Sequence, residues 1–243
     1  MLPMPADLRL PRYQQLRDDL AAQIAQQHWR PGDAIPTEAE LAKTYNVAVG
    51  TVRKAVDVLV AEGLLERFQG RGTFVRRASF ASSLFRFFRF QSEAGERRIP
   101  ESRILKRDVL DAPSAPAAGL QIETGAPVIR LTRLRLLDRA PLLAEEIWLP
   151  HDRFADLATL DLGAFGDLLY PLYESHCGQI IASAEETLTA EAVNATYARL
   201  LRIQAGDPVM VIERVARGYD RVPLEWRRSR GAAAHFRYHV DIR

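Results

Sequence analysis

Residues 37–77 carry the strongest structural signal in the sequence. Thr37 and Glu40 have the spacing of a capping box. In that motif the threonine hydroxyl accepts from the glutamate backbone N–H, and the glutamate carboxylate accepts from the threonine N–H. The helix that begins there is expected to end near Asn46, because asparagine tolerates the left-handed backbone found at helix ends. The sequence therefore predicts a short helix with a tight turn behind it.

The residues on either side of this short helix extend the pattern. The next helix stops at Gly63, and its apolar face is formed by Val52, Ala55, Val56, Leu59 and Val60. Two β-rich stretches follow, residues 64–68 and 73–76, and residues 69–72 are predicted to form the tip of a hairpin. An earlier amphipathic helix is predicted over about residues 13–27, with one apolar stripe of Leu16, Leu20 and Ile24.

Two helices joined by a tight turn and followed by a basic, glycine-tipped hairpin predict a winged helix-turn-helix. In such a fold the second helix enters the major groove of DNA, while the hairpin reaches the backbone or the minor groove. The hairpin carries Arg67, Arg71, Arg76 and Arg77. The candidate DNA-binding residues are Thr37, Ala48, Val49, Gly50, Thr51, Arg53, Lys54, Gln69, Gly70, Arg71 and Gly72.

The second half of the chain contains an internal repeat. Leu120-x-Ile122-x-x-Gly125-x-Pro127-Val128 recurs 81 residues later, and Asp138-Arg139-x-Pro141-Leu142 recurs 82 residues later. Each copy is expected to run from a helix through a Gly-x-Pro turn into a strand, a hairpin and a return strand. The fold class is therefore α+β, with two similar halves sharing an antiparallel sheet on which helices pack. A ligand is expected between the halves.

The expected domains are a DNA-binding domain over residues 8–77, a linker over 78–92 and an effector-binding and dimerisation domain over 93–243. The segment 78–107 is rich in phenylalanine and arginine. Its phenylalanines have two interpretations, a stacking platform for nucleic acid or a buried strand of the second domain, of which we favour the strand.

Composition agrees with a folded protein of the cytoplasm. The 243 residues are 47% hydrophobic and 26% charged, with a net charge of +2. Spanning a bilayer takes about 20 consecutive apolar residues, and no stretch of the chain reaches that length. The first eleven residues lack the apolar core of a signal peptide. The single cysteine, Cys177, cannot form an internal disulfide, as expected in a reducing compartment.

The stretch from Pro11 to Val75 resembles the DNA-binding domain of the GntR family of bacterial regulators. The matching motifs are Pro11-Arg12-Tyr13-Gln14-Gln15-Leu16, Pro31-Gly32-Asp33, Pro36-Thr37-Glu38-x-Glu40-Leu41-Ala42, Thr51-Val52-Arg53-Lys54-Ala55, Ala61-Glu62-Gly63-Leu64 and Gln69-Gly70-Arg71-Gly72-Thr73-Phe74-Val75. The remainder resembles the UTRA effector-binding domain of the HutC-type branch, which is similar in fold to chorismate lyase. The residues that carry this second resemblance are Arg133-Leu134-Arg135, Glu145, Leu149-Pro150, Ala184-Glu185-Glu186, Gly206-x-Pro208-Val209 and Pro223-Leu224-Glu225.

The chain departs from the family at two positions of the DNA-binding domain. Ala39 and Val49 stand where members of the family commonly have arginines that read guanine. A short apolar side chain can contact a thymine methyl group but cannot form a bidentate pair with guanine. We therefore expect an operator unlike the family's usual one, with Arg53 and Lys54 on phosphates.

The resemblance also implies an effector site. Arg133 and Arg135 match a phosphate-holding arginine pair, while Asp167 stands where sugar-phosphate-sensing relatives have a serine, which disfavours a phosphate dianion. On a strand the two arginines point to one face, so they need either a bound anion or carboxylates between them. Both alternatives stay open, an anionic effector or ion pairs with Glu145 or Asp167. The full set of candidate effector-binding residues is Phe90, Arg133, Arg135, Glu145, Asp167 and Glu225.

Other functions are less favoured. Lysine-based enzyme chemistry is excluded in the second domain because no lysine follows Lys106. No nucleophile elbow or phosphate-cradling loop is present. His176 and Cys177 are expected to point to opposite faces of a strand, and His235 and His239 to lie on a terminal strand, so we expect no catalytic residues, no metal and no cofactor. A DNA-binding architectural protein without a ligand remains an alternative to the favoured interpretation, a homodimeric repressor on double-stranded operator DNA.

Overall fold

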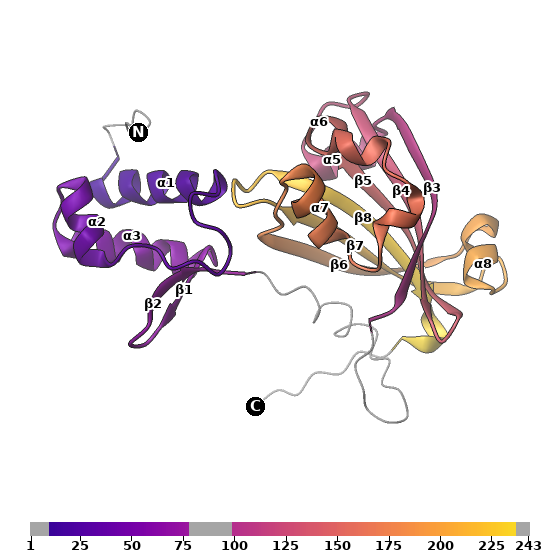
Figure 1. Cartoon of the computed structure of the whole chain (residues 1–243). Helices are drawn as coiled ribbons and strands as arrows, with labels where there is room; N and C mark the ends of the chain where they lie inside the picture. Colours follow the sequence, from indigo (N-terminus) through magenta and orange to yellow (C-terminus); the bar gives the residue numbers. More distant parts are fainter. Residues whose placement is uncertain (1–9, 78–98, 237–243) are drawn as a thin grey trace. The chain divides into compact units, whose positions relative to one another are not determined.

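The computed structural model describes residues 10–77 and 99–236 (Figure 1). The chain divides into two compact units. Among the described residues, the first unit comprises 10–77 together with Gly218–Arg221, and the second comprises 99–217 and 222–236.

The first unit has the predicted helices and hairpin. Its elements are α1 (Arg12–Ala25), α2 (Glu38–Tyr45), α3 (Val49–Ala61), β1 (Leu65–Phe68) and β2 (Gly72–Val75). The capping box of α2 is present, with Thr37 N–H donating to Glu40 Oε2 at 2.8 Å and Glu40 N–H donating to Thr37 Oγ1 at 3.3 Å. Asn46 ends the helix with a φ of 50°. The predicted winged helix-turn-helix is therefore confirmed.

Helix packing explains the apolar stripes of the first unit. The stripe of α1 is buried, and so is the face of α3 formed by Val52, Ala55, Val56 and Leu59. β1 and β2 pair antiparallel, with Leu65 opposite Val75 at the base of the hairpin. At its tip Gly70 and Gly72 have φ values of 73° and 115°, which side chains with a Cβ rarely adopt. The hairpin is therefore anchored by apolar residues at its base, and its narrow turn depends on glycine.

The second unit is built on one antiparallel sheet. The elements of its first half are β3 (Glu101–Asp111), α5 (Ser114–Leu120), β4 (Pro127–Leu137) and β5 (Ala140–Pro150). A connecting segment follows, made of α6 (His151–Phe154), η1 (Ala155–Ala158), η2 (Leu162–Phe165) and α7 (Leu169–Cys177). The second half comprises β6 (Ser183–Ala192), α8 (Ala195–Leu201), β7 (Pro208–Arg217), β8 (Pro223–Ala232) and the short η3 (Ala233–His235).

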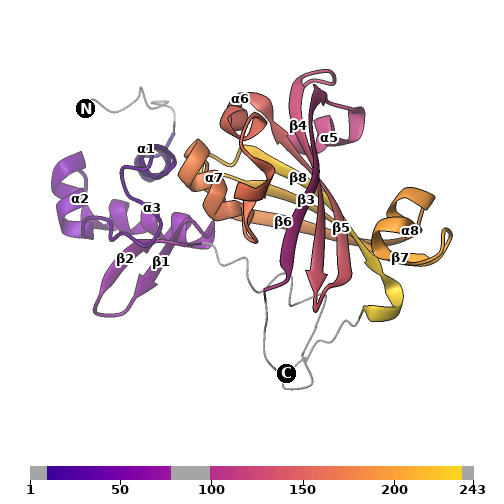
Figure 2. The same ribbon diagram turned by 45° about the vertical axis from the view of Figure 1, so that its right-hand side comes forward.

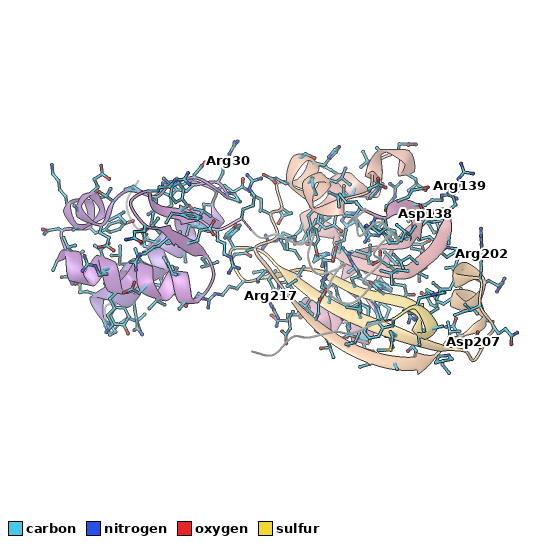
Figure 3. All side chains as sticks on the ribbon, turned by 90° about the horizontal axis from the view of Figure 1, so that it is seen from below. Arg30, Asp138, Arg139, Arg202, Asp207 and Arg217 are labelled. Atoms are coloured by element: carbon cyan, nitrogen blue, oxygen red, sulfur yellow. The ribbon has the colours of Figure 1, made fainter. Side chains whose placement is uncertain are left out.

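The sheet confirms the repeat. Its strand order is β3-β4-β5-β8-β7-β6, so each half contributes three strands and the halves meet where β5 pairs with β8. Asp138 and Arg139 form the predicted turn between β4 and β5 with φ values of 48° and 64°. Figure 3 shows these two residues at one end of the second unit and Arg217, which ends β7, at the other. The two hairpins therefore point in opposite directions, as the antiparallel pairing of β5 and β8 requires.

Helices cover both faces of this sheet. Ile129 and Leu131 of β4 pack with Phe154 of α6 and Tyr173 of α7. The alternate residues of the same strand face the other way, so Leu134 and Leu136 pack with α8. Figure 2 shows α7 and α8 on different sides of the sheet. α5 lies on the same face as α8, where its residues pack with Trp148 and Trp226.

Two expectations need correction, and others fall outside the described residues. His176 and Cys177 lie at the end of helix α7 rather than on a strand, and the His176 ring bonds to the Ser175 hydroxyl at 2.9 Å. The error arose because the short α7 has no long apolar stripe. His235 ends the short 3-10 helix η3 and does not lie on a strand, because the chain turns directly after β8. The linker, its phenylalanines and the rest of the expected terminal strand, with His239, lie outside the described residues. None of the described helices is long and apolar enough to cross a membrane.

Candidate DNA-binding surface and effector site

The candidate DNA-binding residues lie on the surface of the first unit. Val49 begins α3 and is 42% exposed, which is unusual for a valine in a helix whose other valines are largely covered. Thr51 is half-buried, while the side chains of Arg53 and Lys54 are exposed. The exposed first turn of α3 can therefore present apolar groups to bases, with basic groups one turn further on. Gln69–Gly72 are exposed at the hairpin tip.

A carboxylate links the exposed helix to the hairpin. Glu38 of α2 accepts from Arg53 Nε of α3 at 2.9 Å and from Arg67 Nη2 of β1 at 3.0 Å. Arg67 also pairs with Asp57 of α3. The sequence pattern predicts that Arg53 contacts a DNA phosphate. It does not predict the ion pair between Arg53 and Glu38, because Glu38 belongs to another helix. Glu38 positions two arginines that come from different elements.

The other basic residues of this surface have different partners. Lys54 Nζ lies 4.0 Å from the centre of the Tyr13 ring. The Arg71 guanidinium lies 5.7 Å from the centre of the Phe68 ring, at the tip of the hairpin. Arg77 Nη2 donates to the Pro31 carbonyl at 2.9 Å and so fastens the end of the hairpin segment to the turn after α1.

The candidate effector residues gather on the face of the sheet that α7 covers. Arg133 of β4 lies opposite Glu145 of β5, and both are 1% exposed. Arg133 Nε donates to Glu145 Oε2 at 2.5 Å, and the Ser229 hydroxyl donates to Glu145 Oε1 at 2.7 Å. The ion pair that the sequence left open as an alternative is therefore present for Arg133.

Arg135 is in a different situation from Arg133. It is 2% exposed, and its Nη1 donates to the backbone carbonyl of Asp167 at 3.0 Å. The Asp167 carboxylate accepts instead from the Ser102 backbone N–H at 2.7 Å. Arg135 Nε and Nη2 are buried and have no hydrogen-bond partner among the residues that the structure describes. Arg135 is thus a buried cation with two donor nitrogens that no described residue uses.

A second group of charges lies beside the first, where β8 and α7 meet. Glu225 is fully buried and accepts from Arg227 Nη2 at 2.7 Å and from the Tyr173 hydroxyl at 2.8 Å. The Tyr170 hydroxyl is 3.3 Å from the other oxygen of Glu225. Arg214 of β7 donates to the Tyr170 hydroxyl at 3.1 Å and pairs with Glu186 of β6.

Glu225 was among the residues expected at the site, but most of its neighbours were not. Arg227 and Ser229 follow Glu225 at the two-residue spacing of a strand, so alternation alone places all three on one face. Tyr170 and Tyr173 could not be found that way, because they come from a helix that the sequence pattern did not predict. Phe90, the remaining candidate, lies outside the described residues.

Electrostatics separate Arg135 from the other buried arginines. Burial lowers the pKa of Arg135 to about 10, and the neighbouring charge of Arg133 adds to this effect. Burial acts in the same direction on Arg227, but Glu225 and Tyr170 outweigh it and raise the pKa of Arg227. Burial alone would raise the pKa of Glu145, whereas Arg133, Arg227 and Arg135 lower that pKa to about 2. The arginines therefore hold Glu145 ionised, and the charge of Arg135 is the least compensated.

A DNA-binding winged helix-turn-helix combined with an α+β domain that holds buried cations defines a class of protein, the transcription regulator controlled by a small molecule. Comparisons with known proteins agree. The family described as "Bacterial regulatory proteins, gntR family" matches residues 12–75, and the UTRA domain matches residues 95–237.

Individual relatives cover most of the chain. It is 30% identical over 210 residues to the mannosyl-D-glycerate transport/metabolism system repressor MngR of Escherichia coli, covering 86% of this chain and 85% of the relative. It is 29% identical over 235 residues to the repressor NagR of Bacillus subtilis, covering 96% of both. The crystal structure of PhnF from Mycobacterium smegmatis superposes with a TM-score of 0.54 at 26% identity, covering 93% of this chain and 98% of that one.

The chain belongs to the GntR family of bacterial regulators and carries a UTRA domain. It is a DNA-binding transcription regulator under the control of a ligand, and its relatives are regulators rather than enzymes.

Proposed function

We propose that this regulator is a repressor whose effector is a small organic anion bound by Arg133 and Arg135, with Glu145, Asp167, Glu225 and Phe90 around it. The observation that carries the proposal is the buried guanidinium of Arg135 with two donors that no described residue uses. Leaving buried donors of a charged group unsatisfied costs more than about 1–3 kcal/mol. A bound anion offsets that cost, whereas a neutral ligand without acceptors does not.

The surroundings of Arg135 favour an anion with little charge. Arg133 is already paired with Glu145, so it adds less uncompensated positive charge than its position suggests. Asp167 brings a carboxylate beside the site. The relative MngR is named for the use of mannosyl-D-glycerate, whose glycerate part is a carboxylate. These features support an organic acid over a sugar phosphate.

A metabolite panel tests the proposal. Calorimetry is to be run with organic acids, sugar phosphates and neutral sugars on wild type, Arg133→Ala and Arg135→Ala, alongside operator binding. Loss of one hydrogen bond to a charged ligand weakens binding tenfold or more. We expect both variants to lose the effector response and to keep operator affinity, while Arg103→Ala, an exposed change on β3, keeps both. Effector binding that is undiminished in both arginine variants contradicts the proposed site.

We infer further that two copies bind a pseudo-palindromic operator in the cytoplasm. One recognition helix reads few base pairs, and two-fold pairing doubles what is read. The proposed domains are residues 8–77 for DNA, 78–92 as linker and 93–243 for effector binding and dimerisation. Release then requires the effector to bind more tightly to the arrangement of the dimer that does not fit the operator.

A further inference from the structure

Two residues of the second unit, Arg135 and Ser102, together hold several unsatisfied buried polar atoms. Among the residues that the structure describes, seven buried side-chain nitrogen or oxygen atoms have no hydrogen-bond partner. Three of the seven belong to two residues, Arg135 with its Nε and Nη2 atoms and Ser102 with its hydroxyl. The other four are single atoms of four separate residues: Trp148, Arg227, Arg228 and Arg230.

Strand pairing brings Arg135 and Ser102 together. Ser102 of β3 lies directly opposite Arg135 of β4. Side chains of directly opposite residues in an antiparallel pair share a face, and their Cβ atoms lie about 4.5–5.5 Å apart. The Ser102 hydroxyl and the Arg135 side chain are therefore neighbours on the face that also carries Arg133.

The unused atoms of Arg135 have a specific geometry. Its Nη1 is occupied by the Asp167 carbonyl at 3.0 Å. Nε–H and Nη2–H remain, and these two donors point in parallel from one edge of the planar guanidinium. Such an edge binds the two oxygens of a carboxylate, or two oxygens of a phosphate, through two parallel hydrogen bonds. A backbone carbonyl thus fixes the guanidinium and leaves its two-donor edge available.

We propose that Arg135 and Ser102 form a subsite for a carboxylate group of the effector, and that Asp167 selects this singly charged group over a phosphate dianion. Two carboxylate oxygens accept from Nε and Nη2 of Arg135, and one of them also accepts from the Ser102 hydroxyl. The proposal rests on the proposed function, because it names the chemical class of the effector that the same site takes.

Asp167 supplies the discrimination between the two kinds of anion. Its carboxylate is fixed beside the subsite, because it accepts from the backbone N–H of Ser102 at 2.7 Å. Repulsion between charges scales with their product, so a dianion is opposed twice as strongly as a monoanion at the same distance. Asp167 is solvent-exposed, which moderates this repulsion without cancelling it. The attraction to Arg135 doubles for a dianion as well, so Asp167 selects by cancelling part of that attraction. The second charge of a phosphate gains less from the site, while a dianion costs more to remove from water than a carboxylate does.

The pKa of Arg135 agrees with a missing anionic partner. Burial and the charge of Arg133 lower this pKa to about 10. A carboxylate held against the guanidinium edge supplies the missing negative charge, as Glu225 does for Arg227. The remaining subsite residue, Ser102, is neutral and adds a donor without adding charge.

The test uses three pairs of probes, each with one carboxylate and one phosphate on a similar carbon skeleton: D-gluconate and D-glucose 6-phosphate, D-glycerate and glycerol 3-phosphate, and D-galactonate and D-galactose 6-phosphate. Their affinities for the full chain are to be measured by calorimetry. The variants are Ser102→Ala, Asp167→Asn and Arg135→Ala, with Ser183→Ala as a matched control because Ser183 is an exposed serine of the edge strand β6. Circular dichroism checks that each variant is folded.

We expect at least one carboxylate to bind wild type more tightly than its phosphate partner. Ser102→Ala should weaken that carboxylate roughly tenfold, by loss of a hydrogen bond to a charged group. Asp167→Asn should strengthen the phosphate partner more than the carboxylate and so narrow or reverse the preference, and Ser183→Ala should change neither affinity.

The proposal is overturned if no carboxylate of the three pairs binds, or if Ser102→Ala and Asp167→Asn both behave like wild type. In the second case, loss of binding in Arg135→Ala still supports an anion site at that arginine, so the proposed function survives without this subsite. Unchanged binding of every probe in Arg135→Ala removes the proposed effector site itself.

Discussion

At the scale of single residues, Glu145 holds several charged and polar side chains together inside the effector domain. Glu145 is a buried carboxylate that holds Arg133 and Ser229, and Arg227 lies 3.8 Å away. A buried pair of this kind is weak support for overall stability, but removal of one partner leaves the other charge buried and uncompensated. A change at Glu145 is therefore expected to destabilise the fold by leaving the buried positive charges of the neighbouring arginines uncompensated.

Glu145→Gln is expected to lower the free energy of unfolding at pH 7 by about 3 kcal/mol. The pKa of Glu145 is lowered to about 2 in the folded chain, against about 4.3 in an unfolded one. A depressed carboxyl pKa stabilises the fold above the unfolded value, and this contribution is lost as pH falls toward the folded value. Urea unfolding should show the difference between wild type and variant shrinking as pH falls from about 5 toward about 2.

Glu101→Gln serves as the control for this change, because Glu101 is an exposed carboxylate paired with Arg103. Exposed ion pairs contribute less than about 1 kcal/mol to the free energy of unfolding, so Glu101→Gln should have a small effect. A loss in Glu145→Gln that is the same at neutral and at acidic pH would show that the carboxylate charge is not its cause.

At the scale of elements, the helices and hairpin of the first unit are joined by charge as well as by packing. Glu38 of α2 holds Arg53 of α3 and Arg67 of β1. All three side chains are at least 25% exposed, so the pairs are weak and exchangeable. DNA phosphates can therefore replace Glu38 as the partner of Arg53.

Arg53→Ala and Arg71→Ala should each weaken operator binding, and Arg53→Ala should reduce the slope of log affinity against log salt by about one unit. Glu38→Gln should act in the opposite direction and raise the affinity for non-operator DNA, because it removes a negative charge and frees Arg53, while Arg67 keeps its ion pair with Asp57. Glu123→Gln, an exposed change in the second unit, is the control. Fluorescence anisotropy over a salt series measures all of these. Unchanged binding in both arginine variants contradicts the proposed DNA-binding surface.

The packing of α5 on the sheet depends on one glycine. A Cβ at Gly119 would lie 2.1 Å from Cδ1 of Trp226. Gly119→Ala should therefore destabilise the second unit by about 1–3 kcal/mol through overpacking. Gly50 lies in α3, and a Cβ there would have no neighbouring atom within 4 Å, so Gly50→Ala should leave stability equal or slightly higher. Thermal unfolding followed by circular dichroism compares the two, and equal melting temperatures would mean that α5 shifts to make room.

At the scale of the whole molecule, a DNA-binding unit and an effector unit lie in one chain, and the proposed homodimer doubles both. A single winged helix-turn-helix makes few base contacts, so specific binding needs a second one at a fixed spacing. The gain in operator affinity therefore depends on the symmetry of the operator and not only on the affinity of one DNA-binding unit.

An operator with two half-sites should accordingly bind much more tightly than the same DNA with one half-site scrambled. The protein should sediment as a dimer with and without DNA. Shifting one half-site by about five base pairs, which turns it to the other side of the helix, should weaken binding as much as scrambling it. A monomer that binds one half-site as tightly as the full operator would refute the dimer.

Local sequence patterns were sufficient to predict the elements of the first unit and the duplicated plan of the second. The capping box at Thr37, the turn at Asn46 and the Asp138-Arg139 turn act through neighbours in the chain, so local chemistry is sufficient to predict them. The face shared by Arg133 and Arg135 followed from the two-residue period of a strand.

Which charged side chains pair with one another depends on contacts between elements that are far apart in the chain. Glu145 pairs with Arg133 because the register of β4 and β5 places these two residues opposite each other. The Asp167 carboxylate accepts from the Ser102 backbone N–H, so Arg135 is left with only the Asp167 backbone carbonyl as its acceptor. Ser102 comes to the site from the edge strand β3, and Tyr170 and Tyr173 come from helix α7, which is distant in the sequence. Sequence periodicity does not predict these contacts. The register between strands and the position of a helix on a sheet are set by packing between elements that are distant in the sequence.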